Sequence, residues 1–111
     1  MNKHKLQELA LAVIDIESRA VAALAGEIRE TGFFHACQLM LDCKGRVVVN
    51  GMGKSGHIAG KIAATLASTG TPAFFVHPGE ASHGDLGMIT ASDVVLALSN
   101  SGETAEIITI L

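Results

Sequence analysis

The stretch Val47-Val48-Val49, which leads into the loop Gly51-Met52-Gly53-Lys54-Ser55-Gly56, decides the fold class of this chain. Three successive β-branched residues are typical of a strand that is buried on both faces of a parallel sheet. After the glycine loop, apolar residues recur near a spacing of 3.6 from Ile58 to Ala67, which predicts an amphipathic helix. A buried strand, a glycine loop and a helix together predict the beginning of a β-α-β unit.

Two further apolar runs predict the rest of a parallel sheet. Ala73–Val76 follows the helix-ending turn Ser68–Pro72, and Val94–Leu98 is a third buried strand. Crossover connections join parallel strands and are right-handed. The C-terminal ends of the first and third strands should therefore lie at one edge of the sheet, which is where open α/β sheets bind ligands. The region before the sheet shows two helical patterns, from Leu6 to Ile28 and from Phe33 to a stop at Lys44-Gly45.

We therefore predict an α/β fold, an incomplete parallel-sheet αβα sandwich preceded by N-terminal helices. Residues 1–45 form a helical segment that packs on the sandwich, and residues 46–111 form its first part. The 111 residues, 49% of them hydrophobic and 17% charged, suit a buried core.

Composition and charge restrict the partner. A net charge of −3 with phenylalanine as the only aromatic residue type argues against a nucleic-acid surface. No apolar run approaches the roughly 20 residues of a membrane span. Cys37 and Cys43 lack metal or redox spacing and no signal peptide opens the chain, which predicts the reducing cytoplasm. The expected partner is a small molecule.

The glycine loop is the first chemical signal. Glycines let a backbone approach a ligand closely, and the N-terminus of the following helix attracts an anion such as phosphate. The G-x-G-x-x-G pattern also fits a dinucleotide site, but His77 stands where a ribose-binding acid is expected and Glu80 is the nearest acid. A P-loop fits worse, because it requires glycine where the chain has Val48.

Two polar segments follow the second and third strands. Ser99-Asn100-Ser101-Gly102-Glu103-Thr104 offers hydroxyls and a helix start to a phosphate, although simple helix capping explains it as well. His77–Gly87 carries His77 and His83, whose imidazoles can move a proton, polarise a carbonyl or bind a metal. Two histidines without a third ligand leave the zinc interpretation open.

The motifs Gly51–His57, Ser68–Pro72, His77–Gly87 and Ser99–Thr104 together resemble those of arabinose 5-phosphate isomerases, whose phosphosugar-binding domain is of SIS type. The resemblance implies that Lys54 and Glu106 are catalytic and that His77 is also a zinc contact, with no cofactor required. It implies a cytoplasmic homo-oligomer, a tetramer, that binds a sugar phosphate and neither nucleic acid nor membrane. The substrate-binding residues that it implies are Ser55, Gly70, Thr71, His77, His83, Ser99, Ser101 and Thr104.

An aldose–ketose isomerase opens the sugar and moves a proton between neighbouring carbons through an enediol, which requires a base and an electrophile. Glu106 would be the base or acid, Lys54 would stabilise the developing negative charge, and His83 would donate a proton or hold the substrate. Simpler interpretations are that Glu106 is an exposed carboxylate in the first turn of a helix and that Lys54 is a solvated cation in a loop.

Two other functions stay open, a non-catalytic phosphosugar-binding module and a fragment of a dinucleotide-dependent oxidoreductase. The chain ends within an apolar helical pattern, Ile107–Leu111, so we expect a truncated domain. Family members continue with further strands, an additional glutamate and histidine, and often CBS modules. Whether the product supplies lipopolysaccharide or capsule precursors is also left open.

Overall fold

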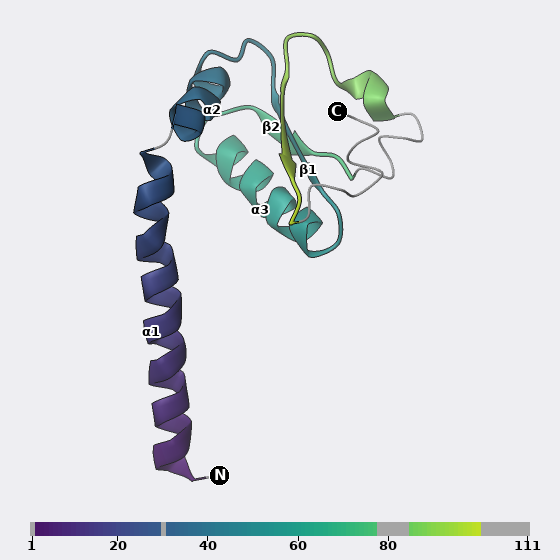
Figure 1. The fold of residues 1–111 in the computed structure, drawn as a ribbon. Coiled ribbons are helices and arrows are strands. Elements are labelled where there is room, and N and C mark those ends of the chain that lie inside the picture. Colours follow the sequence, from purple (N-terminus) through teal and green to yellow (C-terminus); the bar gives the residue numbers. More distant parts are fainter. Residues whose placement is uncertain (1, 30, 78–84, 101–111) are drawn as a thin grey trace. The chain divides into compact units, whose positions relative to one another are not determined.

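Three parallel strands form the sheet of the structure, a computed structural model that describes residues 2–29, 31–77 and 85–100 (Figure 1). β1 (Val47–Gly51) lies between β2 (Ala73–Phe75) and β3 (Val94–Leu98), and both pairings are parallel. The predicted parallel sheet is confirmed, and in it the first and third strands are adjacent. β2 is one residue shorter than predicted, although the Val76 N–H still donates to a β1 carbonyl.

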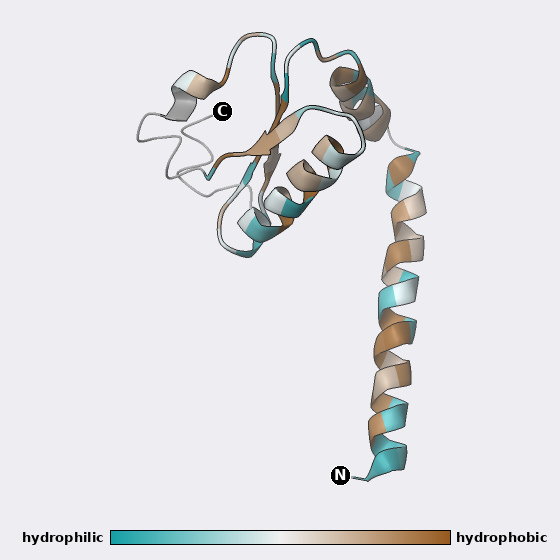
Figure 2. Ribbon diagram, turned by 180° about the vertical axis from the view of Figure 1, so that it is seen from behind, coloured by the Kyte–Doolittle hydropathy of each residue, from teal (hydrophilic) through white to brown (hydrophobic). Residues whose placement is uncertain are grey.

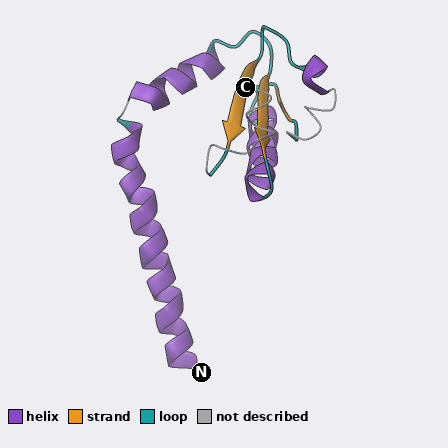
Figure 3. Cartoon of the chain, turned by 45° about the vertical axis from the view of Figure 1, so that its right-hand side comes forward, coloured by secondary structure: helices purple, strands orange, loops and turns teal. Residues whose placement is uncertain are grey.

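One face of the sheet is covered by α3 (Lys54–Ser68), the helix seen beside the strands in Figure 3. Val47 and Val49 point to this face and are fully buried against Ala59 and Ala63. Alanines at these helix positions let α3 lie close to the strands. Met40, Ile62, Leu66, Ala73, Leu96 and Leu98 complete this core.

The opposite face carries a second apolar cluster. Val48 and Val76 are buried there, and Phe74, Ile89 and Val95 pack against them. Because side chains alternate along a strand, Asn50 shares this face with Val48. Its side chain is fully buried, and neither its amide nitrogen nor its amide oxygen has a hydrogen-bond partner among the described residues.

Asp93 forms hydrogen bonds at the edge of the sheet where β1 and β3 begin. Its carboxylate accepts hydrogen bonds from the backbone N–H groups of Arg46, at 2.7 Å, and Thr90, at 2.8 Å. Both hydrogen bonds lower the pKa of Asp93 because they favour the charged carboxylate, and the bond from Thr90 has the larger effect. The Arg46 guanidinium lies 4.3 Å from the centre of the Phe74 ring and donates to the carbonyl of Met88, the last residue of the short helix η1 (Asp85–Met88).

The chain divides into two compact units, residues 1–38 and 39–111, and the second contains the sheet. The first unit is mainly α1 (Lys3–Ile28), which begins where the Asn2 side chain accepts a hydrogen bond from the Lys5 N–H. α2 (Thr31–Leu41) follows and ends three residues before the predicted stop at Lys44. The predicted packing of residues 1–45 on the sandwich stays a prediction.

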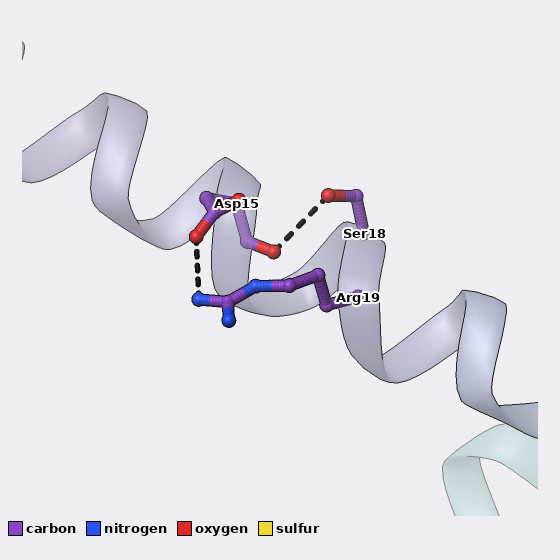
Figure 4. Close-up of polar contacts among 3 residues, drawn as sticks. All are labelled: Asp15, Ser18 and Arg19. Carbon is purple, nitrogen blue, oxygen red and sulfur yellow. Dashed lines mark hydrogen bonds and ion pairs between the residues drawn. The ribbon is translucent and has the colours of Figure 1, made fainter.

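α1 is a long helix without buried residues. Asp15 and Arg19, one turn apart, form an ion pair, and the Ser18 hydroxyl donates to the Asp15 carbonyl at 3.1 Å (Figure 4). Apolar residues recur along the helix, as the brown segments of Figure 2 show. The exposed large apolar side chains of α1 are Leu6, Leu9, Leu11, Val13, Ile14, Ile16, Val21, Leu24 and Ile28.

Candidate functional site

The glycine loop connects the end of β1 to the beginning of α3. Gly53 is the N-cap residue of α3 and has a φ of +56°, a left-handed conformation that favours glycine. Lys54 is therefore the first residue of the helix, with Ser55 next. The N–H groups of Gly56 and His57 donate to loop carbonyls. The first N–H groups of a helix have no partner within the helix, so those of Lys54 and Ser55, which show no backbone acceptor among the described residues, are the donors that this helix end can present to an anion.

Two other glycines bring the helix against the strand. A Cβ atom on Gly56 would lie 2.6 Å from the carbonyl oxygen of Gly51, and one on Gly51 would lie 2.8 Å from the backbone of Ser55. Either contact is too short for a side chain. Gly51 and Gly56 thus allow the close approach of α3 to β1, while Gly53 provides the turn.

A hollow of about 470 Å³ lies between the first turns of α3 and the end of β3. The structure brings three predicted site residues, Lys54, Ser55 and Ser99, to its wall. Lys54 supplies a cation and the serines supply hydroxyls, so the wall suits a phosphate group. The complete lining is Lys54, Ser55, Ile58, Ala97, Leu98, Ser99 and Asn100.

His77 lies in a different hollow, on the β2 side of the glycine loop. This second hollow has a volume of about 250 Å³, and its lining is Gly53, Gly56, His57, Phe75 and His77. The structure therefore places His77 near the same loop as Lys54 without placing the two residues in one cavity. His57, which the sequence analysis did not select, brings a second imidazole to the lining.

Gly70 and Thr71 lie at the far end of α3. Gly70 follows the helix with a φ of +102°, and the Thr71 N–H donates to the Leu66 carbonyl at 2.9 Å. The 15 residues of α3 span about 22 Å, which is longer than a five-carbon sugar phosphate. Within one chain, the structure does not bring Gly70 and Thr71 together with Lys54, and their contact with substrate stays a prediction.

Several predicted site residues lie outside the described residues, namely His83, Ser101, Thr104 and Glu106. Four residues at the hollow were not selected from the sequence, Ile58, Ala97, Leu98 and Asn100. A signal for two of them exists in the chain. Ile58 lies one helical turn after Lys54, and Asn100 stands between two predicted phosphate-binding serines.

The described ranges 2–29, 31–77 and 85–100 contain no group of three or more histidine, cysteine or acidic side chains that would hold a metal ion. The zinc contact of His77 stays a prediction. None of the helices in these ranges has the length and apolar character needed to cross a membrane.

Residues 40–111, which include the sheet, the glycine loop and both hollows, match the SIS domain family model. The chain belongs to the SIS domain family. The SIS-type fold predicted from the sequence is therefore confirmed, as a three-stranded part of that fold with helices.

Relatives with high identity are arabinose 5-phosphate isomerases. The Pseudomonas aeruginosa enzyme KdsD is 67% identical over 102 residues, which are 92% of this SIS chain and 31% of that protein. KdsD of Escherichia coli K12 is 60% identical over 101 residues, 91% of this chain and 30% of that protein. The chain therefore spans about a third of the length of these relatives.

A solved structure shares the fold. A protein of E. coli CFT073, in complex with arabinose 5-phosphate, superimposes with a TM-score of 0.87 at 49% identity. The match covers all of this SIS chain and 58% of that one. The predicted resemblance to arabinose 5-phosphate isomerases is thus confirmed.

Proposed function

We propose that this chain is the phosphosugar-binding part of an aldose–ketose isomerase that interconverts arabinose 5-phosphate and ribulose 5-phosphate. The observation that carries the proposal is the convergence of Lys54, Ser55 and Ser99 on one hollow at the N-terminus of α3. The sequence relatives support the choice of sugar. The solved relative in complex with arabinose 5-phosphate supports binding of a sugar phosphate at this fold.

The hollow would hold the phosphate end of the sugar. An anion there meets the N–H groups of the first turn of α3 and the positive end of the helix dipole. The Ser55 hydroxyl can donate to a phosphate oxygen, which leaves the Lys54 ammonium for the reacting end of the sugar. Lys54 is exposed, so its flexible side chain can reach a ligand in the hollow.

The reaction needs a base and stabilisation of negative charge. A base removes the proton from C2 of the open-chain aldose, and the electrons form an enediolate with its negative charge on O1. The hydroxyl proton of O2 passes to O1, and a proton returned to C1 gives the ketose. In the proposal Glu106 transfers these protons and His83 assists, while Lys54 stabilises the enediolate oxygen electrostatically. No cofactor takes part in this proton transfer.

A chimera tests the proposal directly. Residues 1–111 would replace the matching segment of the P. aeruginosa KdsD enzyme, and conversion of arabinose 5-phosphate would be followed with and without Lys54→Ala. We expect isomerisation by the chimera and a loss of about 10²-fold or more in kcat/KM with Lys54→Ala. A folded chimera that binds the sugar phosphate without converting it would refute the enzyme and favour a binding module.

We also propose that the chain works as a cytoplasmic homo-oligomer, a tetramer by resemblance. The large apolar side chains that recur along α1 support self-association. Val13→Glu would place a charge on this apolar helix. We expect the variant to elute as a smaller species in size-exclusion chromatography with light scattering, and an unchanged mass would count against a role of α1 in assembly.

A further inference from the structure

Ile58 is a large apolar side chain that the core of the sheet does not use. On α3, the residues that contact the strands are Ala59 and Ala63, with Ile62 and Leu66 beside them. The side chain of Ile58 is 58% exposed and lines the hollow of about 470 Å³. Because Ile58 is exposed, it can contact a ligand that binds in the hollow.

The spacing of α3 places Ile58 beside the charged and polar wall of the hollow. Residues three and four positions apart share one face of a helix, so Ile58 lies next to Ser55 and Lys54. All three line the same cavity. An apolar side chain at such a place excludes water, and charge interactions strengthen where water is excluded.

We propose that Ile58 shields the bound sugar phosphate and the Lys54 ammonium from water and thereby sets the affinity of the hollow for its anionic ligand. This inference rests on the proposed binding of a sugar phosphate in the hollow. It adds Ile58 as a binding residue whose contribution is apolar, in a site otherwise defined by charge and hydroxyls. The shielding makes the affinity less sensitive to salt than an open surface ion pair would be.

Two substitutions whose side chains are nearly isosteric with each other separate shape from polarity. Ile58→Val keeps an apolar branched side chain, whereas Ile58→Thr replaces one methyl group of that shape with a hydroxyl. The 111-residue chain and both variants would be titrated calorimetrically with arabinose 5-phosphate and with inorganic phosphate, at low and at high sodium chloride. Thermal unfolding without ligand would be measured in parallel.

We expect Ile58→Val to bind arabinose 5-phosphate within about threefold of the parent, since it loses one methylene of a half-exposed side chain. Ile58→Thr should bind about tenfold more weakly, with a steeper loss of affinity as salt rises. The unfolding temperatures of the two variants should agree, because this position is exposed.

Three outcomes would overturn the inference. Equal affinity and equal salt dependence of Ile58→Thr and the parent would show that Ile58 shields nothing while leaving the proposed binding site intact. A loss of affinity that matches a fall in unfolding temperature would assign Ile58 a purely structural role. If the parent chain binds neither arabinose 5-phosphate nor phosphate, the proposed function fails, and the inference fails with it.

Discussion

Replacing Asn50 by leucine should stabilise this chain. Asn50 lies in the central strand β1, is fully buried, and has two amide atoms without partners among the described residues. A buried polar group without a hydrogen bond costs about 1–3 kcal/mol. Leucine has nearly the same shape and no such group, so Asn50→Leu should raise the free energy of unfolding by about 1–3 kcal/mol.

Urea denaturation measures this effect. With a slope of about 1–3 kcal/mol per molar urea, the midpoint should rise by roughly 1 M at an unchanged slope. Asn50→Asp is the matched control, because it keeps the shape and buries a charge, and it should lower the midpoint. If Asn50→Leu lowers the midpoint instead, the amide has a hydrogen-bond partner in solution, and the reasoning from its burial is wrong.

Two further predictions concern the packing of α3 and the edge of the sheet. Gly56→Ala should destabilise the chain by about 1–3 kcal/mol, because its Cβ would meet a β1 carbonyl oxygen at 2.6 Å. Gly60→Ala, on the same helix with nothing within 4 Å, should stabilise it by about 1 kcal/mol, and equal effects in urea denaturation would contradict this account. The pKa of Asp93 is lowered in the folded chain, so its charged carboxylate stabilises the fold at pH values above the unfolded aspartate pKa of about 3.9. This contribution is lost as the pH falls through the pKa of Asp93 in the folded chain. Asp93→Asn should therefore lower the unfolding temperature at pH 7, with a difference from the parent that shrinks in acid, and a constant difference would refute the role of the charge.

The sheet was predictable because its strands carry an unambiguous pattern. Val47–Val49 and Val94–Leu98 are continuous apolar runs between loop signals, and right-handed crossovers leave few arrangements for them. The end of α2 was less predictable. Gly45 suggested a helix stop, but in the structure it lies against Ser92 and Asp93 at the start of the sheet, so its small size serves a contact between segments distant in sequence.

The sequence predicted which loop residues belong to the site, but not which cavity each residue lines. The convergence of Lys54, Ser55 and Ser99 follows from parallel strands that end at one edge. The separation of His77 into a second hollow depends on how α3 lies across the sheet, which periodicity does not specify. Ile58 was not predicted as a site residue, because an apolar residue in a helical stripe is normally assigned to the core.

Nuclear magnetic resonance titration with arabinose 5-phosphate tests the central claim most directly. The backbone amide signals of the 15N-labelled chain would be followed as the sugar phosphate is added. We expect the signals of Lys54, Ser55, Ser99 and Asn100 to shift together with one dissociation constant, while those of α1 stay in place. Saturating ligand that leaves these four signals unmoved would contradict a phosphosugar site at the N-terminus of α3.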